Sequence, residues 1–514
     1  MRSVPIGWKA TKLRDVVQLR TGPFGSSLHR SDYVEDGIPI VNPMHINNGH
    51  IQASSKHGVS EGTAARLRDF QLRVGDIVLG RRGEMGRCAV VGEKQSGWLC
   101  GTGSIVITAH SGIQPDYLQR LLSSDAVIKN LTNESVGSTM VNLNQQILLD
   151  LDLAVPPRNE QTRIVEKIEE LLSDLDAGVA ELKAAQRKLA QYRQSLLKAA
   201  VEGALTAEWR VARAKAGEPQ ETGAELLQRI LTERRIRWET RQLAKFAEQG
   251  KTPPKDWKTK YPEPIAPDTT NLPELPESWV WASVEQLGAV QLGRQRSPDK
   301  MKGVCPVQYI RAANITEQGI NFNDVLEMDF SETEIATFKL NAGDVLLTEA
   351  SGSPQHVGRP VVWPKVDGVY CFQNTVIRFV PRGIDSNYAF CIFQAWQKLG
   401  VFQKLSGGVG INHLSAGKFL TVPVPLPSRE EQNAIVDSVA AAVVLVDEQG
   451  LAIEHSLKQA TAQRKNILKA AFAGQLVPQD PNDEPASVLL ERIRANRTSN
   501  AAPKLRGGKT RKSA

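Results

Sequence analysis

The sequence lacks several features that identify secreted and membrane proteins. It has only five cysteines, at positions 88, 100, 305, 371 and 391, and none of them forms a Cys-x-x-Cys pair. Isolated cysteines of this kind are typical of reduced thiols in the cytosol. No run reaches about 18 uninterrupted apolar residues, and residues 1–8 have no apolar core of a signal peptide. We therefore expect a cytoplasmic protein that does not enter a membrane.

Residue groups that carry catalysis or bind metals are also scarce. The eight histidines do not cluster with cysteines or carboxylates at ligand spacing, and His45, His50 and His57 are the closest group. Asn42-Pro43-Met44-His45 is similar to the Asn-Pro-Pro-aromatic motif of adenine methyltransferases, but Met44 and His45 replace its last two residues. No glycine-rich cofactor loop follows a strand. The sequence thus predicts no catalytic centre, no metal site and no directly bound cofactor.

Charge and length set weaker bounds. Lys and Arg total 63 against 56 Asp and Glu, a net charge of +7, which favours an anionic partner without requiring one. A chain of 514 residues predicts about three domains, and an internal repeat lowers the number of distinct folds.

One stretch of the chain occurs twice. Aligning Glu160-Gln161 with Glu431-Gln432 sets a shift of 271 positions, which without a gap also pairs Leu197-Lys198-Ala199-Ala200 with Leu468-Lys469-Ala470-Ala471. In the first copy, apolar residues recur in alternating steps of four and three, the heptad spacing of a coiled coil. These seam positions are Ile164, Ile168, Leu171, Leu175, Gly178, Leu182, Ala185, Leu189, Tyr192, Leu196 and Ala199.

Each copy predicts a helix of about 37 residues, or about 55 Å. A helix of that length cannot bury its apolar stripe within one compact domain, so we expect the two copies to pair with each other. The second copy has smaller seam residues and a wider stripe that includes Val436, Val443 and Leu457. Two separate helices, each docked on its own domain, are the alternative.

The segments before the two helical copies indicate mostly β domains. Residues 1 to about 153 alternate short β-branched runs, such as 38–41, 76–80, 88–91 and 104–107, with Gly, Asn and Ser turns, and a helix is expected from Pro115 to Leu131. A second such segment starts at Trp279, 271 positions after Trp8. The strands of the two segments correspond, whereas their loops differ. Two readers of different targets on one scaffold would show this pattern.

The remaining segments connect or follow these parts. Residues 206–278 are charged and proline-rich, with a short helix expected from Ala224 to Phe246 and an extended run from Thr252 to Pro276, which we interpret as a long tether. After the second helical copy, residues 486–493 resemble residues 224–230. The basic residues 504–512 are expected to form a disordered tail.

Two β domains with basic and amide-bearing loops, joined by paired helices, would contact two places on a long, regular, anionic ligand. Duplex DNA fits, because Arg, Asn, Gln and Ser read base edges and phosphates.

With these features the sequence resembles the specificity (S) subunits of type I restriction-modification systems over nearly its whole length. The motifs that carry the resemblance are the Trp8 and Trp279 starts, Thr21-Gly22-Pro23-Phe24-Gly25-Ser26, Gly75-Asp76-Ile77-Val78, Pro156-Pro157, Glu160-Gln161, Leu196-Leu197-Lys198-Ala199-Ala200, Gly343-Asp344-Val345-Leu346, Glu431-Gln432 and Leu468-Lys469-Ala470-Ala471. The proline-rich stretch before Trp279 departs from the family pattern by its length.

The resemblance implies an α+β fold with an internal repeat and pseudo-twofold symmetry. Its parts would be target recognition domain 1 (1–153), conserved helical region 1 (154–205), a connector with a short helix (206–278), target recognition domain 2 (279–421), conserved helical region 2 (422–477), and a short helix with a basic tail (478–514). The two helical regions would pair as an antiparallel coiled coil. The chain would not be catalytic itself.

The resemblance also implies partners. These would be double-stranded DNA, two modification (M) subunits that bind S-adenosylmethionine and methylate adenine, and restriction (R) subunits that use ATP and Mg. Each recognition domain would read one half of a bipartite asymmetric site. The helices would set the unspecified gap between the halves.

Candidate DNA contacts are the polar loop residues of the two β domains. They are Ser26, Ser27, His29, Arg30, Asn42, His45, Arg81, Arg82, Arg87, Ser138, Thr139, Arg294, Gln295, Arg296, Arg311, Asn314, His356, Arg359, Asn374 and His413. Two other interpretations stay open: a coiled-coil scaffold that joins two ligand-binding β domains, and a DNA methyltransferase or nuclease that acts alone. The absent cofactor and metal motifs disfavour the latter.

Overall fold

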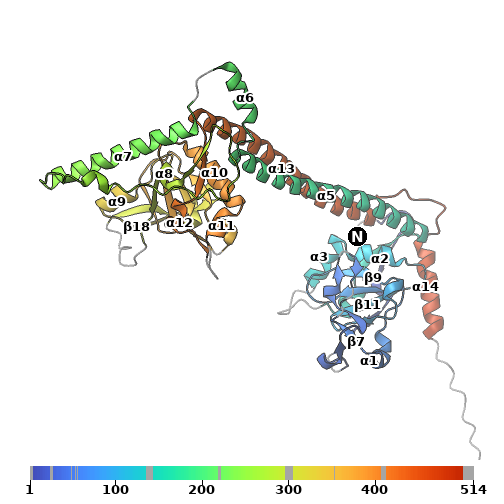
Figure 1. Cartoon of the computed structure of the whole chain (residues 1–514). Helices are drawn as coiled ribbons and strands as arrows, with labels where there is room; N and C mark the ends of the chain where they lie inside the picture. Colours follow the sequence, from blue (N-terminus) through green and yellow to red (C-terminus); the bar gives the residue numbers. More distant parts are fainter. Residues whose placement is uncertain are drawn as a thin grey trace, which may run out of the picture. The chain divides into compact units, whose positions relative to one another are not determined.

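A computed structural model of the chain describes residues 4–23, 27–47, 49–52, 54, 56–134, 143–217, 221–295, 305–351, 353–406 and 412–501. The chain divides into two compact units, one formed by Met1–Lys183 with Glu454–Ala514 and the other by Ala184–Ile453. Each unit contains one β-rich domain and part of each of two long helices (Figure 1). The mixture of β-rich regions and long helices confirms the expected α+β fold.

Two four-stranded sheets and a terminal strand pair form the first β domain. The first sheet has the order β2 (Val17–Thr21), β11 (Ser104–Ala109), β8 (Ile77–Gly80), β9 (Cys88–Val90). The second has the order β10 (Leu99–Cys100), β4 (Ile38–Val41), β7 (Gly58–Val59), β3 (Tyr33–Val34). The terminal pair is β1 (Lys9–Lys12) with β12 (Asp152–Val155), which ties the start of the domain to its end. A short pair also joins β5 (Ile46–Asn47) to β6 (His50–Ile51).

The second β domain repeats this plan. Its main sheet has the order β14 (Gly288–Leu292), β23 (Val376–Pro381), β19 (Val345–Thr348), β21 (Pro360–Val362). A three-stranded sheet has the order β18 (Leu326–Asp329), β15 (Pro306–Ile310), β22 (Tyr370–Phe372), and the terminal pair is β13 (Val280–Ser283) with β25 (Pro423–Leu426). Two short pairs are β16 (Ile315–Thr316) with β17 (Gly319–Ile320) and β20 (Ala350–Ser351) with β24 (Asn412–His413).

Short helices cover the sheets. In the first domain they are α1 (Glu61–Arg66), α2 (Pro115–Leu122), α3 (Asp125–Glu134) and α4 (Gln145–Leu149); in the second they are α8 (Val284–Leu287), α9 (Glu332–Phe338), α10 (Ser386–Lys398), α11 (Val401–Leu405) and α12 (Ala416–Leu420). The single helix expected from Pro115 to Leu131 is wrong. It breaks into α2 and α3 at Ser123-Ser124, where the Ser123 hydroxyl donates to the Gln119 carbonyl at 2.9 Å.

The strands have apolar residues on both faces because each main sheet lies between two cores. Along β8, Ile77 and Leu79 join the core shared with the helices, whereas Val78 joins a smaller core on the opposite face. In β19, Val345 and Leu347 face the helix side and Leu346 faces the other side. Successive strand residues point to opposite faces, so a strand buried on both sides needs a continuous apolar run.

The two long helices are α5 (Arg158–Val201) and α13 (Arg429–Phe472), each of 44 residues and thus longer than expected. They pair antiparallel in both units. In the first unit Arg464 forms an ion pair with Asp176, and in the second Arg193 lies 3.2 Å from Asp447. The 271-residue shift converts one pair into the other, so the same contact occurs twice. Tyr192, an expected seam residue, is instead 53% exposed.

The segment after each long helix packs on a β domain. In the first unit α14 (Ala486–Ala501) lies beside the first domain, and Ala486 N donates to the Gly7 carbonyl at 2.9 Å (Figure 1). In the second unit α7 (Gly223–Glu248) follows α6 (Ala207–Ala216), and Gly223 N donates to the Ser278 carbonyl at 2.8 Å. Gly7 and Ser278 are related by the 271-residue shift, which confirms that the repeat extends to these segments.

The interpretation of residues 206–278 as a tether is wrong. Helix α6 was not expected, and the proline-rich run folds back along α7 instead of extending freely. Trp257 stacks on Trp238 with ring centroids 5.8 Å apart, and the Ser283 hydroxyl donates to the Ile265 carbonyl at 2.6 Å. Composition alone suggested a linker because these contacts join residues far apart in the sequence.

Candidate nucleic-acid interface

The loops at one end of the first domain converge through backbone hydrogen bonds. Gly101 N donates to the Val41 carbonyl, Arg81 N to the Gly103 carbonyl and Leu143 N to the Arg81 carbonyl, each at 2.9 Å. We call this group loop cluster 1; its residues are 21–23, 41–45, 80–87 and 101–103. Because main-chain bonds hold the loops, their side chains are free to differ while the backbone stays in place.

The second domain builds the same cluster with the same backbone bonds. Gln373 N donates to the Ile310 carbonyl at 2.9 Å, Glu349 N to the Thr375 carbonyl at 2.9 Å and Leu414 N to the Glu349 carbonyl at 2.8 Å. Loop cluster 2 comprises residues 292–295, 310–314, 348–351, 353–359, 373–375 and 413–414. Leu414 lies 271 positions after Leu143, so the shared frame reaches into the loops.

Glycines allow the loops to approach closely. A Cβ atom on Gly22 would lie 1.9 Å from the Gly101 carbonyl oxygen, and one on Gly293 would lie 2.3 Å from the Gln373 carbonyl oxygen. Neither position tolerates a side chain without moving the backbone. Gly22 and Gly293 are related by the 271-residue shift, so this close approach belongs to the scaffold and not to either specific loop.

Two of the expected contact residues are buried within their own turns. His45 and Asn314 end equivalent 3-10 turns, and they are only 7% and 0% exposed. His45 Nδ1 lies 2.9 Å from the Ile40 carbonyl oxygen, and Arg311 N donates to Asn314 Oδ1 at 3.0 Å. Burial also lowers the pKa of His45. These side chains shape their loops from inside, which argues against direct contact with a ligand.

Loop cluster 1 presents positive charge. Arg82 is exposed and forms no ion pair with any residue that the structure describes, whereas Arg87 pairs with Glu84 and donates to the Pro43 carbonyl at 3.4 Å. Burial and the neighbouring Arg82 lower the pKa of Arg81. Two adjacent arginines on one loop raise the local positive potential, which favours an anionic ligand.

Loop cluster 2 neutralises several of its charged groups internally. Arg294 Nε lies 3.0 Å from a Glu334 carboxylate oxygen and is 7% exposed. Arg311 Nη2 lies 2.6 Å from Asp324 Oδ2, and His413 Nδ1 lies 3.3 Å from Glu349 Oε2. Arg359 differs from these arginines, because it forms no ion pair among the described residues and its side chain donates only to the Ile315 carbonyl at 3.5 Å. The cluster therefore offers amides, hydroxyls, a histidine and Arg359 to a ligand, together with two arginines that are already paired.

The remaining expected contacts divide by exposure. Half-buried side chains are Ser27, Asn42, Arg81, Arg87, Arg311, Arg359 and Asn374; exposed side chains are His29, Arg30, Arg82, Gln295, His356 and His413. The Ser27 carbonyl accepts from Arg66 of α1 at 2.7 Å, and His29 caps the short 3-10 turn that starts at Arg30. Ser26, Ser138, Thr139 and Arg296 lie outside the described residues.

Several cluster residues are not among the contacts predicted from the sequence. Thr102, Gln373 and Thr375 belong to the converging turns, and the Thr375 hydroxyl oxygen accepts from Ala312 N at 3.2 Å. Gln145 of α4 donates to the Thr21 hydroxyl. Aligning the turn at 101–103 with that at 373–375 would have found the first three. The contact of Gln145 joins residues too far apart in sequence to be read from a pattern.

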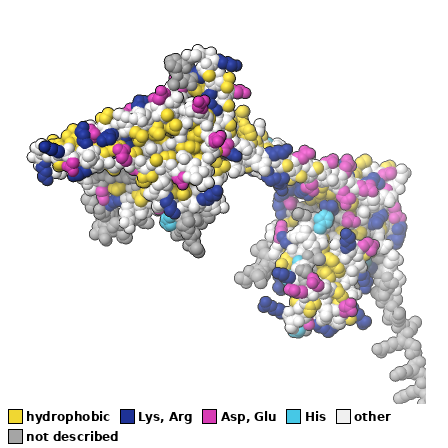
Figure 2. Space-filling model, in the orientation of Figure 1, with side chains coloured by type: hydrophobic (Ala, Val, Ile, Leu, Met, Phe, Trp, Pro, Cys, Tyr) yellow, Lys and Arg dark blue, Asp and Glu magenta, His cyan; other side chains and the backbone are white. Residues whose placement is uncertain are grey.

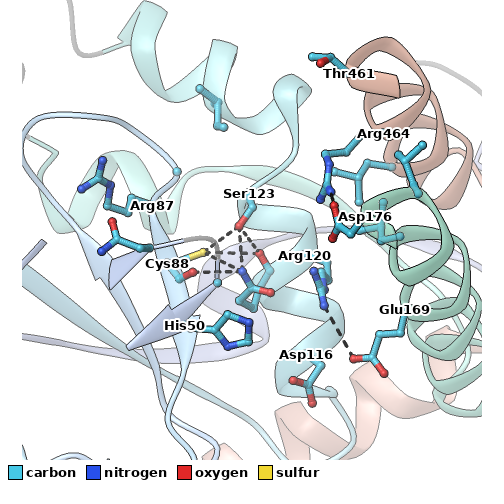
Figure 3. A pocket seen from close by; sticks show the side chains of 18 of the residues that line it. His50, Arg87, Cys88, Asp116, Arg120, Ser123, Glu169, Asp176, Thr461 and Arg464 are labelled. Atoms are coloured by element: carbon cyan, nitrogen blue, oxygen red, sulfur yellow. Dashed lines mark hydrogen bonds and ion pairs between the residues drawn. The ribbon is translucent and has the colours of Figure 1, made fainter. Parts of the chain in front are cut away.

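A separate cleft of 1220 Å³ lies in the first unit between the β9 and α2 side of the domain and the long helices (Figure 3). Arg120 of α2 reaches Glu169 of α5 at 3.8 Å, and Lys465 of α13 lies 3.0 Å from Asp125. Burial raises the pKa of the Cys88 thiol to about 11, so little thiolate forms at neutral pH. The Arg120–Glu169 pair lines this cleft, and it and the Lys465–Asp125 pair both link the domain to the helices.

Metal-binding clusters and membrane-spanning helices are absent from the described parts of the chain. No set of three or more His, Cys, Asp or Glu side chains there is arranged to hold a metal ion. Among those same residues, no helix combines the length and apolar character needed to cross a bilayer.

Comparison with known proteins identifies relatives of this architecture. A family model for the type I restriction modification DNA specificity domain matches residues 5–185 and 276–442. The EcoKI specificity subunit of Escherichia coli K12 is 22% identical over 527 residues, with 98% of both chains covered. The EcoDI specificity subunit of Escherichia coli is 22% identical over 446 residues, which cover 79% of this chain and 85% of that one.

Two solved structures share the fold. A chain from a structure on complex assembly and conformational transition of the type I R-M system gives a TM-score of 0.63 at 16% identity, covering 92% of this chain and 100% of that chain. The HsdS subunit of Thermoanaerobacter tengcongensis gives 0.52 at 17% identity, covering 92% and 98%. Because the family model spans both β domains and the start of each long helix, the chain belongs to the type I restriction-modification DNA specificity subunit family.

Proposed function

We propose that this chain selects the DNA sequence on which a type I restriction-modification complex acts. Residues 1–153 and 279–421 serve as target recognition domains, each of which binds one half of a bipartite asymmetric site. The regions 154–205 and 422–477 pair and set the gap between the halves. The chain is not catalytic itself, and it works in the cytoplasm, where chromosomal and invading DNA are both within reach.

The observation that carries this proposal is the pair of loop clusters. Backbone bonds repeat between them, yet equivalent positions differ in chemistry: Arg81 corresponds to Glu349, and Asn42 corresponds to Arg311. Base edges in the major groove differ in their donors and acceptors. One scaffold with two sets of side chains is therefore suited to reading two different half-sites.

Partner subunits carry out the reactions in this proposal. Two modification subunits bind S-adenosylmethionine and methylate adenine, and restriction subunits use ATP and Mg to cut DNA. Exposed apolar residues on the long helices of the second unit support a docking role, because water-exposed side chains of this size favour a protein partner. They are Tyr192, Val444, Leu445 and Leu451, each more than half exposed.

Reconstitution tests the function. The chain is mixed with a modification subunit of a type I system, duplex DNA and labelled S-adenosylmethionine. We expect adenine methylation only when both proteins are present, at a bipartite site found by sequencing the methylated DNA. Methylation by the chain alone would select the stand-alone methyltransferase, and no effect of the chain on the modification subunit would select the scaffold.

Shortening the helix pair tests the gap. In the sequence, Ala180–Gln186 lies between the ion-pair residues Asp176 and Arg193, and Glu454–Ala460 lies between their partners Asp447 and Arg464, at equal separations. Both heptads can therefore be deleted together while the register of the two ion pairs is kept. The deletion removes about 10 Å of helix, or about three base pairs of duplex. We expect methylated sites with a shorter gap. Deleting only one heptad is the control for misfolding, and an unchanged gap in the double deletion would contradict the spacer role.

A further inference from the structure

The second unit carries a basic element that the two loop clusters do not include. We define the basic arm as the second half of α7 and the segment that folds back on it, residues 229–260. These 32 residues contain ten Lys and Arg against four Asp and Glu, a net charge of +6, while the whole chain has +7. Figure 2 shows the Lys and Arg side chains gathered at the far end of α7.

The arm is a folded element and not a loose connector. After Ile230 no residue of α7 is buried in the β domain, and the helix continues past the domain edge (Figure 1). Aromatic side chains join the helix to the returning segment: Trp238 stacks on Trp257, and Tyr261 packs edge-on against Trp238 with centroids 5.4 Å apart. The ring centroids of Phe246 and Trp257 are 6.3 Å apart. This packing fixes the positions of the charged side chains.

Charge pairing changes along the arm. Near the domain, Arg229 lies 2.9 Å from Glu221, Arg234 lies 3.3 Å from Glu285, and Arg237 lies 3.3 Å from Glu233. At the far end, Arg241, Lys245, Lys251 and Lys255 are all exposed and form no ion pair among the described residues. The base of the arm is thus neutralised, whereas its tip has these four cations and a single carboxylate, Glu248, that likewise forms no ion pair among the described residues.

The spacing of this patch fits a chain of phosphates. Arg241 and Lys245 lie four residues apart on one face of α7, so they are separated by about 6 Å along the helix axis. Duplex DNA carries one phosphate for every 3.4 Å of rise in each strand. Lysine side chains bind phosphates without sequence preference, which suits residues that are not placed in a recognition loop.

Loop cluster 2 supplies a reason for such an arm. Its arginines Arg294 and Arg311 are already tied to carboxylates at 3.0 and 2.6 Å. Neutralising phosphates supplies a large share of the affinity of proteins for DNA, and among the described arginines of loop cluster 2 only Arg359 lacks an ion pair, so cations from elsewhere in the unit would add to this share. We propose that the basic arm binds the backbone of duplex DNA next to the half-site contacted by the second domain, an inference that rests on the proposed DNA-selecting function.

The reach of the arm sets a measurable length. From Leu231 to Glu248 the helix advances about 27 Å, or about eight base pairs of duplex. Protection of DNA from hydroxyl radicals by the complex with modification subunits should therefore extend by up to about eight base pairs on one side only. That side is the one beside the second domain's half-site.

The experiment compares two variants that each remove three positive charges. The arm variant carries Lys245→Ala, Lys251→Ala and Lys255→Ala. The control carries Lys215→Ala, Lys339→Ala and Lys365→Ala, at exposed positions of the same unit away from the arm. Each is assembled with modification subunits and titrated, over a range of salt, with a short duplex that holds the methylated site alone and with a long duplex that has flanks. Circular dichroism checks that α7 stays folded.

We expect the arm variant to bind the short duplex as the wild type does. On the long duplex, log affinity should depend less steeply on log salt concentration. The magnitude of this negative slope should decrease by about 2 to 3, because each of the three lost phosphate contacts contributes about 0.9. The one-sided protection should also disappear, and the control should change neither result. An unchanged slope on the long duplex would overturn the proposal, as would a loss of modification subunits from the complex, which would show that the arm binds an acidic protein surface.

Failure of the proposed function is distinguishable. If no site-specific methylation occurs with any duplex, the DNA-selecting role fails. The salt slope of non-specific binding to the long duplex still reports on the arm in that case.

Discussion

The two junctions between β domain and long helix show what the repeat preserves and what it changes. Trp8 Nε1 donates to Glu160 at 2.9 Å in the first unit, and Trp279 Nε1 donates to Glu431 at 2.8 Å in the second. In both cases the tryptophan precedes the glutamate by 152 positions. Each domain is thus anchored to its helix by the same buried hydrogen bond between residues that are distant in sequence.

The surroundings of the two glutamates differ. Glu431 also accepts from the Thr206 hydroxyl at 2.6 Å and from Arg210 of α6 at 2.5 Å. Glu160 has no such cation in direct contact among the described residues; burial raises its pKa, and nearby Arg163 is engaged by Asp483 at 2.7 Å. The segment after each long helix therefore supplies a charge at the junction, but of opposite sign in the two units. The frame tolerates this because the tryptophan hydrogen bond needs only an acceptor.

The largest expected effect comes from breaking the docking that both units share. A Cβ on Gly112 would lie 2.2 Å from Leu489 of α14, and one on Gly383 would lie 2.4 Å from Ile230 of α7, and both glycines have positive φ. We expect Gly112→Ala or Gly383→Ala to lower the stability of the docked helix by about 2–4 kcal/mol, because of left-handed backbone strain and overpacking. Hydrogen exchange of α14 or α7 amides measures the cost.

The control for this prediction is Gly97→Ala. Gly97 also has positive φ, at +84°, but no atom lies within 4 Å of the position that its new methyl group would take. Gly97→Ala should therefore lower stability only by the backbone strain, about 1–2 kcal/mol. Equal costs at Gly97 and Gly112 would mean that the contact with Leu489 contributes nothing.

A smaller effect should separate the two junctions. Glu431→Gln keeps an acceptor for Trp279 but removes the charge that binds Arg210, which should cost about 1.5–3 kcal/mol. Glu160→Gln removes a buried carboxylate with no directly paired cation among the described residues and should cost less than about 1 kcal/mol. Exchange rates of the β13–β25 and β1–β12 backbone pairs report each junction separately. Equal losses would show that Arg210 does not stabilise the second junction.

The smallest effect is expected at His45, which ends the turn where the second domain has Asn314. The pKa of His45 is lowered mainly by burial, so the unfolded state binds a proton at a higher pH than the folded state. His45 should therefore reduce the stability of its loop as the pH falls below the ordinary histidine value of about 6.5. His45→Asn, which copies Asn314, should remove this pH dependence.

Exchange of the Gln52 amide, which donates to the His45 carbonyl at 2.8 Å, measures this effect after correction for the intrinsic rate. The wild type should lose protection between about pH 7.5 and 5.5, around the ordinary histidine pKa, whereas the variant should keep it. Equal pH dependence in both proteins would assign the effect to another group, such as His110, whose pKa burial also lowers.

Patterns of short range predicted much of the fold. The strands at 38–41, 77–80 and 104–107 follow from β-branched runs between turn residues, and the long helices follow from their heptad spacing. The site was less accessible: His45 and Asn314 looked like contact residues because both are polar and lie in loops. Their burial depends on how each turn folds over its own side chain, which composition does not encode.

The sequence by itself determined the duplication, the two β domains and the two long helices, because these depend on residue spacing that a shift of 271 positions makes visible. Only the tertiary structure decided which loop residues meet, which arginines are already paired, and that residues 206–278 fold back on α7. Those outcomes depend on contacts such as Trp238 with Trp257 and Arg294 with Glu334. Such contacts form between residues whose separation in the chain follows no period, so no local sequence pattern predicts them.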